Sequence, residues 1–327
     1  YRQTNNIKTL VLFQRIEIIF RMNVAVIYGG SSSERDVSVK TGTAVIEALR
    51  SLDMEVSTFL IDEHEIFQIL PELNKADIVY IAFHGSLGED GRIQAILETA
   101  NIPFIGSDSL SSRLAMEKTL SKMLFERHGI PTPPWLAARK GYDKEKLMAA
   151  ARNLGLPLAV KPSREGSTFG FTKVLDYANL PDAIDFALTF DDEALIETFI
   201  EGQELTVSML AGETLPPILI VPHDGLYDYE HKYTKGTTEY ICPAPISDET
   251  AQELERLADM AFKALGCRNY GRVDFRLDND NRPFCLEINT LPGMTSLSLV
   301  PMAAKARGYD FPELLRRILL DALTFFK

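Results

Sequence analysis

The chain of 327 residues is 46% hydrophobic and 24% charged, and it carries a net charge of −12 at pH 7. This length predicts a large core that is divided among two or three domains. The acidic balance argues against a nucleic-acid-binding protein, although a local basic pocket could hold phosphate groups.

The first 21 residues differ from the rest because they carry a net charge of +3, from four basic residues against Glu17. Polar residues interrupt the apolar stretches 9–13 and 16–20, which argues against a membrane span and a secretory signal. We expect residues 1–21 to be an extension without function. No other stretch of the chain is long and apolar enough to span a membrane.

Strands and helices alternate from Met22 to about residue 106. Apolar runs predict strands at 23–28, 56–61, 78–82 and 103–105, and helical spacing predicts helices at 37–51, between 61 and 78, and at 93–100. This alternation is typical of a doubly wound parallel sheet, whose ligands bind at the carboxyl ends of the strands.

Two polar loops follow strands of this predicted sheet, at residues 29–34 (GGSSSE) and 84–91 (HGSLGEDG). The first lacks the G-x-G-x-x-G pattern of dinucleotide-binding folds, and no G-x(4)-G-K-[ST] phosphate loop occurs in the chain. Glu34 could instead bind an ammonium group, or it could simply favour the following helix through the helix dipole. The loop alone leaves both interpretations open.

A helix predicted from about residue 112 to 128 leads into the proline-rich connector 129–134, which is expected to join two domains. Next come a strand at 158–161, a Gly/Ser-rich loop at 162–170, and strands at 172–175 and 194–198. Because Lys161 interrupts an apolar run beside this loop, the pattern predicts a mobile cover for phosphate groups; a surface hairpin is the alternative. The tyrosine-rich stretch 227–236 is typical of an active-site lid or of an ordinary surface loop.

The segment near the C-terminus carries the most informative pattern. Two strands with a period of two, joined by a polar turn, place Asp274 on one strand and both Glu287 and Asn289 on one face of the other. Carboxylate and amide oxygens of this kind suit Mg²⁺ that is shared with nucleotide phosphates. Any hairpin can carry acids on its solvent face, but Arg272 and the Pro-Gly at 292–293 add a cation and a backbone N–H where an oxyanion could form.

Six motifs, in order along nearly the whole chain from Met22, together resemble the D-alanine–D-alanine ligase family of the ATP-grasp superfamily. They are GGSSSE (29–34), HGSLGEDG (84–91), VKPSREGSTFG (160–170), YDYEHKY (227–233), GRVDF (271–275) and EINTLPGMT (287–295). The resemblance implies an α/β fold, with a doubly wound N-terminal domain at 22–106 and two ATP-grasp subdomains at 107–200 and 201–327. It also implies a cytoplasmic homodimer that serves peptidoglycan precursor synthesis, with no nucleic-acid or membrane partner.

The reaction that the resemblance implies begins with ATP phosphorylating the carboxylate of one D-alanine. The amino group of a second D-alanine then attacks the acyl phosphate, and D-alanyl-D-alanine, ADP and phosphate are released. Two Mg²⁺ or Mn²⁺ ions, held by Asp274, Glu287 and Asn289, bridge the phosphates. The positions that match the family's ATP-binding residues are Lys118, Lys161, Glu197, Thr198, Phe199, Ile200, Glu204 and Lys232.

Further matching positions concern the two amino acids. Glu34 matches the residue that binds the ammonium group of the first D-alanine, and His84 is expected near its carboxylate. Arg272 and the backbone N–H of Gly293 match the groups that stabilise the tetrahedral oxyanion. Ser298 matches the residue that binds the carboxylate of the second D-alanine.

Ser167 and Tyr233 match partners of Glu34 in a hydrogen-bonded triad that closes the lid against water. Depsipeptide-forming relatives commonly lack tyrosine at this lid position, so an amide product is expected. A different ATP-grasp ligase need not keep Glu34, Ser298 and Tyr233 together, and a non-enzymatic scaffold would be expected to have lost metal ligands or Arg272. A Rossmann dehydrogenase is disfavoured because its glycine fingerprint is absent.

Overall fold

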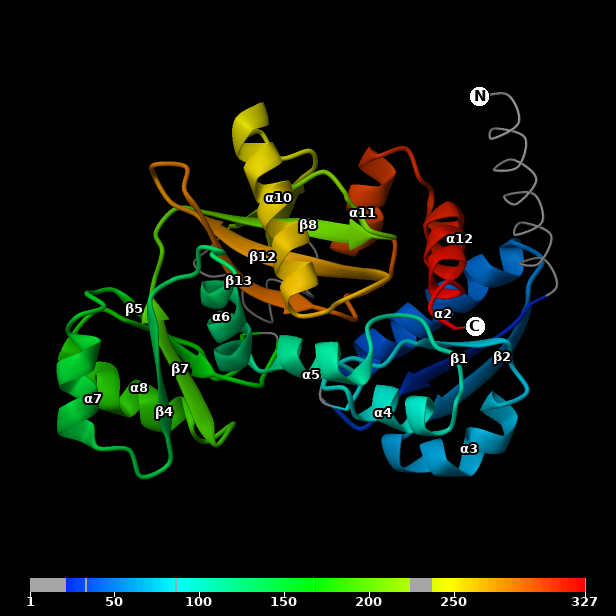
Figure 1. Ribbon diagram of the computed structural model, residues 1–327, viewed down its shortest axis with the longest axis horizontal. Coiled ribbons are helices and arrows are strands. Elements are labelled where there is room, and N and C mark those ends of the chain that lie inside the picture. The colour runs from blue at the N-terminus through cyan, green and yellow to red at the C-terminus, as the bar shows by residue number, and fades with distance from the viewer. Residues whose placement is uncertain (1–21, 33, 86, 167, 224–236, 327) are drawn as a thin grey trace.

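The structure is a computed structural model that describes residues 22–326 apart from Ser33, Ser86, Ser167 and residues 224–236. Three sheets form its framework, and Figure 1 shows the chain passing from the N-terminal sheet (blue) to a second sheet (green) and back to a third (yellow-green to orange) that lies between them. This mixture of strands and helices confirms the α/β class predicted from the sequence.

The N-terminal sheet is parallel, with the strand order β2-β1-β3, as the alternating pattern predicts. An isolated parallel bridge between Val79 and Phe104 extends it. Val24 to Ile27 in β1 are all fully buried, which is typical of parallel strands covered on both faces. The elements are β1 (Asn23–Gly29), α2 (Arg35–Ser51), β2 (Glu55–Ile61), α3 (Ile66–Leu73), β3 (Ile78–Ile81) and α4 (Arg92–Thr99).

The single helix predicted at 112–128 is wrong, because two helices, α5 (Ser109–Met116) and α6 (Lys118–Arg127), occupy this region. Between them Glu117 has an extended backbone, with φ −85° and ψ 92°. The backbone N–H of Lys118, freed from helical bonding, donates to the carbonyl of Ser163 at 3.1 Å. The break therefore joins the start of α6 to the Gly/Ser-rich loop.

The second sheet has the order β4-β7-β5-β6, with antiparallel neighbours. Its strand β4 follows the proline-rich connector and has no counterpart in the sequence prediction. Leu158, Val160 and Ile196 of the sheet pack with Ile184 of the covering helix in a separate core. The elements are β4 (Trp135–Arg139), α7 (Lys144–Ala151), β5 (Leu158–Pro162), β6 (Thr172–Val174), α8 (Leu180–Ala187) and β7 (Glu193–Thr198).

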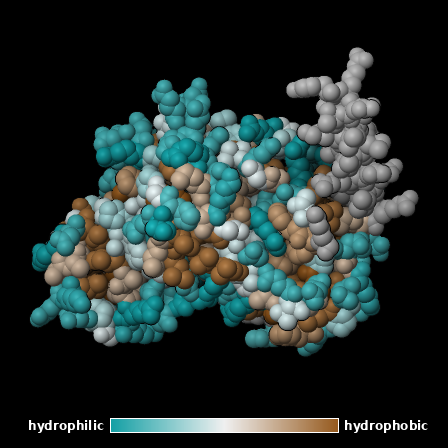
Figure 2. Space-filling view, in the orientation of Figure 1, coloured by the Kyte–Doolittle hydropathy of each residue, from teal (hydrophilic) through white to brown (hydrophobic). Residues whose placement is uncertain are grey.

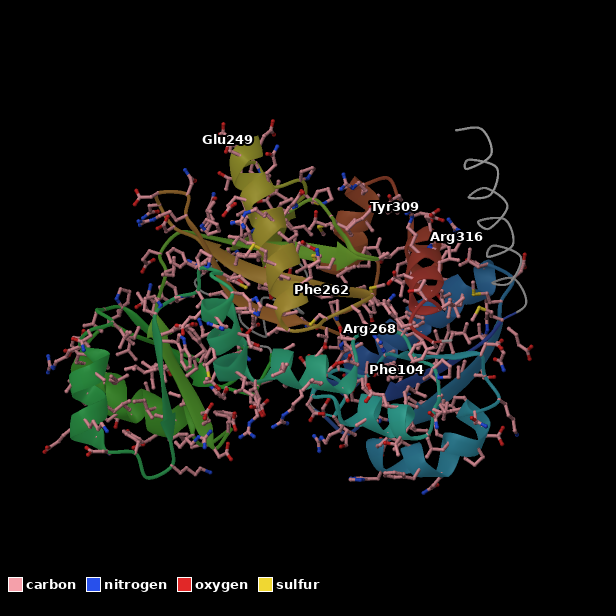
Figure 3. The ribbon with its side chains drawn as sticks, viewed as in Figure 1. Phe104, Glu249, Phe262, Arg268, Tyr309 and Arg316 are labelled. Carbon is pink, nitrogen blue, oxygen red and sulfur yellow. The ribbon has the colours of Figure 1, made fainter. Side chains whose placement is uncertain are left out.

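The third sheet is antiparallel, with the order β11-β10-β8-β12-β13, and β9 pairs with β8. Helix α10 covers it with Leu254, Leu257, Ala258 and Ala261, which recur at helical spacing on one buried face. The far end of α10, where Glu249 lies, is surrounded by hydrophilic residues (Figures 2 and 3). The elements are β8 (Gln203–Leu210), β9 (Glu213–Thr214), β10 (Ile218–Pro222), β11 (Thr238–Ile241), α10 (Asp248–Ala264), β12 (Tyr270–Leu277) and β13 (Pro283–Asn289).

The last two helices, α11 (Leu299–Ala306) and α12 (Phe311–Ala322), return to the N-terminal sheet. Leu314 and Ile318 of α12 are fully buried in the same hydrophobic core as β1 and β3, and Figure 1 shows α12 beside α2. The domain boundaries expected from the sequence stay a prediction, since this core joins residues 22–106 to the end of the chain. Among the described residues, no helix is both long and apolar enough to cross a membrane.

Arg268 ties the two ends of this shared core together, beside Phe104 in Figure 3. Its guanidinium carbon lies 5.8 Å from the ring centre of Phe104, 4.7 Å from that of Phe325 and 5.3 Å from that of Phe326. Its Nε also donates to the carbonyl of Gly106 at 3.3 Å. A cation over an aromatic face is attracted by the negative side of the ring quadrupole, so this arginine fastens Phe325 and Phe326 to the residue 104–107 segment.

Replacing this arginine, in Arg268→Ala, should lower the free energy of unfolding by about 1–2 kcal/mol, because the aromatic contacts and the hydrogen bond are lost together. Urea denaturation followed by circular dichroism measures the change. The control is Arg256→Ala, whose guanidinium pairs with Glu253 at the surface of α10 and whose loss should leave the midpoint nearly unchanged. Equal midpoint shifts in both variants would contradict a fastening role for Arg268.

Candidate active site

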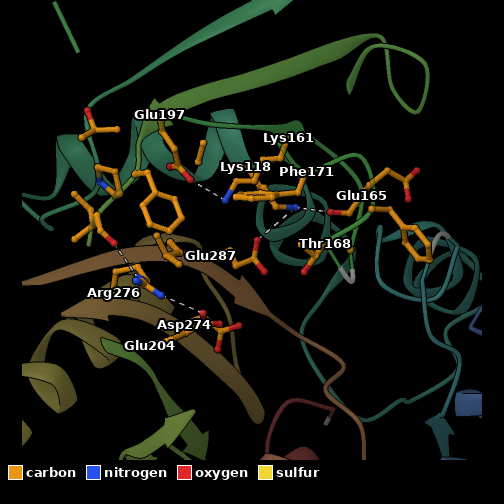
Figure 4. A pocket seen from close by; sticks show the side chains of 18 residues that line it. Lys118, Lys161, Glu165, Thr168, Phe171, Glu197, Glu204, Asp274, Arg276 and Glu287 are labelled. Atoms are coloured by element: carbon orange, nitrogen blue, oxygen red, sulfur yellow. Dashed lines mark hydrogen bonds and ion pairs between the residues drawn. The ribbon is translucent and has the colours of Figure 1, made fainter. Parts of the chain in front are cut away.

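Two adjoining cavities lie between the sheets, and both are lined by Lys118, Gly166 and Glu287. The first cavity lies between the second and third sheets (Figure 4), and its empty space, including the part open to solvent, is about 900 Å³. The second lies between the third sheet and the N-terminal loops, with about 1360 Å³ measured in the same way. The three lining residues common to both show that the two cavities adjoin.

Two ammonium groups reach the first cavity. Lys161 extends from β5, and its Nζ lies 2.8 Å from Glu197 Oε1. Burial opposes its charge, but the nearby carboxylates of Glu197 and Glu287 outweigh burial and raise the pKa of Lys161. Lys118, the first residue of α6, donates from Nζ to the carbonyl of Glu165 at 2.7 Å and lies 3.5 Å from Glu287. These cations suit the phosphate groups of a nucleotide.

The inner wall of the first cavity contains a buried charge network. Glu197 on β7 is 3% exposed and lies between Lys161 and Lys122, with 2.7 Å between its Oε2 and Lys122 Nζ. Burial alone would raise the pKa of Glu197, but Lys122 and Lys161 outweigh it and lower the pKa. Removing one partner of such a pair typically costs about 3–5 kcal/mol, since it leaves a buried charge uncompensated.

The outer wall of the first cavity is formed by Thr198, Phe199 and Ile200, which follow Glu197 at the end of β7. Arg276 on β12 holds this turn, donating from Nε to the carbonyl of Ile200 at 3.0 Å. It also donates to the carbonyl of Gly202 at 2.9 Å. An aromatic ring and an aliphatic side chain at such a turn suit a planar base.

Two cations flank the ring of Phe199. The Nζ of Lys173 lies 3.9 Å from the ring centre, and the guanidinium carbon of Arg276 lies 5.3 Å from it. Arg276 is also 3.4 Å from Glu204, which lines the same cavity. These contacts hold Phe199 and Glu204 at the mouth of the cavity.

The hairpin of β12 and β13 brings the predicted metal ligands together. Asp274 and Glu287 are direct partners across the two strands, and Arg272 is the partner of Asn289. Arg272 binds the Asp274 carboxylate with both Nε and Nη2, each at 2.8 Å. Thr206 donates to the same carboxylate at 2.6 Å.

These residues fit a magnesium ion. Among the described residues no three His, Cys, Asp or Glu side chains cluster as a metal site. The donor set here is instead two carboxylates and the amide oxygen of Asn289, on neighbouring positions of one hairpin, which is the hard-oxygen set that Mg²⁺ shares with phosphates. Glu287 lines both cavities, so a cation beside it could serve both.

The second cavity receives Glu34 from the loop after β1. Glu34 immediately precedes α2 and is 7% exposed. The loop is held to the second N-terminal loop by Ser32, which donates from its hydroxyl to the carbonyl of His84 at 2.9 Å. At Gly85, whose φ is +76°, a Cβ would approach Glu34 Oε2 to 3.0 Å, so glycine suits both the backbone conformation and the close approach of this carboxylate. A buried carboxylate in this position suits an ammonium group.

His84 is 6% exposed and is fixed on both ring nitrogens. Its Nε2 lies 2.9 Å from the hydroxyl of Thr41 on α2, and its Nδ1 lies 3.4 Å from Glu89. The same Thr41 hydroxyl accepts from the backbone N–H of Met294 at 3.5 Å. Thr41 therefore connects His84 with the loop that carries Gly293.

Ser298 directly precedes helix α11 and lines the second cavity with Gly293. Its hydroxyl accepts from the backbone N–H of Thr295 at 3.0 Å, which fixes the loop. A Cβ at Gly293 would approach this hydroxyl to 3.0 Å. The positive end of the helix and the hydroxyl together suit a carboxylate.

Every described residue assigned to the site from sequence lines one of these two cavities. Their individual roles stay predictions, and Ser167, Lys232 and Tyr233 lie outside the described residues. Sequence reasoning missed Lys122 and Arg276. Lys122 follows Lys118 by four residues on one helix face, and Arg276 follows Asp274 by two on one strand face, so the spacing itself could have indicated both.

Comparison with known proteins agrees with this geometry. The family model described as "D-ala D-ala ligase C-terminus" matches residues 124–320, and "D-ala D-ala ligase N-terminus" matches residues 66–107. The chain is 47% identical over 306 residues to the D-alanine–D-alanine ligase of Bordetella petrii, and the matched region covers 91% of each chain. 

Two solved structures are similar in fold. The D-alanine–D-alanine ligase from Bacillus anthracis complexed with ATP has a TM-score of 0.81 and 33% identity, covering 93% of this chain and 98% of that one. The VanG D-Ala:D-Ser ligase from Enterococcus faecalis has a TM-score of 0.81 and 29% identity, covering 92% and 99%. The matched family models and the Bordetella relative show that the chain belongs to the D-alanine–D-alanine ligase family, which has the ATP-grasp fold.

Proposed function

We propose that this protein uses ATP to join two D-alanine molecules into D-alanyl-D-alanine for cell-wall precursor synthesis. The observation that carries the proposal is that the two cavities meet at Lys118 and Glu287. ATP in the first cavity would place its terminal phosphate beside the carboxylate of a D-alanine in the second. Family membership supplies the identity of the substrates.

The residues of the first cavity bind and orient the nucleotide. Lys118 and Lys161 offset the charge of the phosphates, and the turn at Thr198 to Ile200 receives the base. Asp274, Glu287 and Asn289 would hold magnesium or manganese. When bound, the metal neutralises charge that develops on the phosphates.

The residues of the second cavity orient the two amino acids. Glu34 binds the ammonium group of the first D-alanine, while the start of α11 with Ser298 binds the carboxylate of the second. The carboxylate of the first D-alanine takes the terminal phosphoryl group of ATP, and the amine of the second then displaces phosphate to form the amide. Arg272 and the N–H of Gly293 stabilise the oxyanion of that attack, a contribution of about 3–4 kcal/mol for a well-placed donor.

The test is phosphate release from MgATP in the presence of D-alanine, with L-alanine, D-lactate and D-serine in parallel, and mass spectrometry of the products. We expect release that depends on D-alanine, with the dipeptide as product. Preferential formation of the mixed D-alanyl-D-serine dipeptide would change the second substrate and keep the mechanism. Turnover with none of these acids and amines would reject the proposal.

The proposal also includes a cytoplasmic location and a homodimeric state. Family membership supports each of them. The dimer is tested by light scattering on the purified protein, where a mass near twice that of the 36.6 kDa chain is expected. A monomer that is active at all concentrations would reject this part alone.

A further inference from the structure

Lys122 lies behind the first cavity and has no part in the function proposed above. Its side chain is 0% exposed, and it lies one helical turn after Lys118 on α6. Besides the contact with Glu197, its ammonium group donates to the hydroxyl of Thr132 at 2.6 Å and to the carbonyl of Pro133 at 3.4 Å. A buried ammonium group is costly unless it is paired and hydrogen-bonded, so these contacts define a specific position for a positive charge.

Glu197 is shared between this lysine and the cavity. Its Oε2 faces Lys122 at 2.7 Å, and its Oε1 faces Lys161 at 2.8 Å. Of the two lysines only Lys161 lines the cavity, with 14% of its side chain exposed. Lys122, Glu197 and Lys161 therefore form a row of alternating charge. Lys161, at the end of the row, faces the cavity.

We propose that Lys122 is a positioning residue: by holding one oxygen of Glu197, it keeps that carboxylate from neutralising Lys161, which stays available to the phosphates of ATP. The inference rests on the proposed function, because it takes the first cavity as the ATP site. With Lys122 in place the row has one excess positive charge. Without it, the charges of Glu197 and Lys161 cancel.

The surroundings of Lys122 also connect it to the metal ligands. Thr132, which accepts from Lys122, donates its hydroxyl proton to the carbonyl of Cys285 at 2.8 Å. Cys285 lies on β13, two residues before Glu287. Lys122 is thus connected to Lys161 through Glu197, and to the strand that carries Glu287 through Thr132.

The ionisation of the row is consistent with this role. The pKa of Glu197 is lowered, as described above, so the carboxylate stays charged near neutral pH. Burial lowers the pKa of Lys122, although the attraction of Glu197 opposes this. Loss of Lys122 would leave Lys161 as the cation nearest to Glu197.

The test compares Kd values of MgATP and of adenosine, which lacks phosphates, for Lys122→Met. We expect MgATP binding to weaken by about tenfold relative to adenosine binding, because only the phosphates sense the charge of Lys161. Adding Glu197→Gln to this variant removes the unbalanced carboxylate. The affinity ratio of the double variant should return to within about twofold of that of Glu197→Gln alone.

Equal weakening of both ligands, or a double variant without recovery, would overturn the proposal, since a merely structural lysine predicts those results. If Lys122→Met does not fold, the ratio of the Kd values of MgATP and adenosine for Glu197→Gln alone tests the inference. That variant should increase the preference for MgATP over adenosine, and an unchanged or reduced preference would reject the inference.

Lys161→Met separates this inference from the proposed function. If the affinity ratio of this variant equals that of the wild type, the first cavity does not hold the phosphates, and both proposals fail. If the ratio falls in Lys161→Met and is unchanged in Lys122→Met, only the role of Lys122 is rejected.

Discussion

Glu287→Gln is expected to lower kcat by about 10³-fold while the protein keeps its fold, because an amide removes the charge that a metal ion requires at the junction of the two cavities. Glu287 is partly exposed, with 30% of its side chain accessible, and its ion-pair partner Lys118 lies 3.5 Å away. Little packing is lost when its charge is removed. The measurement is steady-state phosphate release with ATP and D-alanine over a range of Mg²⁺ concentrations, with the melting temperature recorded in parallel.

The matched control is Asp280→Asn, which removes a carboxylate from the turn of the same hairpin, where 75% of the side chain is exposed. This variant should retain wild-type kinetics. A Glu287→Gln enzyme with activity close to wild type at ordinary Mg²⁺ concentrations would refute the metal assignment. A strongly lowered melting temperature would point to a structural role for Glu287 instead.

Arg272→Lys should lower kcat/KM by about 10²-fold although it keeps the positive charge. The guanidinium binds both oxygens of Asp274 with two parallel donors, and a lysine ammonium cannot reproduce this planar geometry. Asp274 would lose its orientation, and the proposed oxyanion would lose a fixed donor. The kinetic constants for ATP and for D-alanine, measured separately, show the effect.

The control for this variant lies on the same hairpin. Arg282 pairs with Asp278 at 2.8 Å, but 68% of its side chain is exposed, so Arg282→Lys should change neither kinetic constant appreciably. Similar small effects in Arg272→Lys and Arg282→Lys would mean that charge alone, without geometry, suffices at position 272. That result would reject the requirement for the paired donors of a guanidinium at this position.

The parts of the fold that were predictable from sequence have a local cause. Strand β1 is a continuous apolar run between polar segments, and β12 alternates with a period of two before a polar turn. The pairing of Asp274 with Glu287 was less predictable, because the register shifts between Asp274 and Phe275, where β13 carries one extra residue, Leu286.

The parts that were missed depend on contacts between distant segments. Helical spacing continues through Glu117, with neither proline nor glycine to interrupt it, and the contacts that accompany the break, such as the bond from the Lys118 N–H to Ser163, are with a distant loop. Lys122 follows Lys118 by one helical turn, so its helix face was predictable, but nothing local indicates that its partner is Glu197, which is remote in the sequence. Propensity and periodicity do not contain such information.

The core that α12 shares with β1 and β3 has a consequence for how the chain acquires its structure during synthesis. Residues 22–106 leave the ribosome well before α12, the helix that completes their core. The N-terminal sheet therefore keeps apolar surface exposed until α12 has been translated. Glu34 and His84 reach their final surroundings only when the C-terminal helices dock, so the amino-acid-binding half of the site matures last although its first residues are made first.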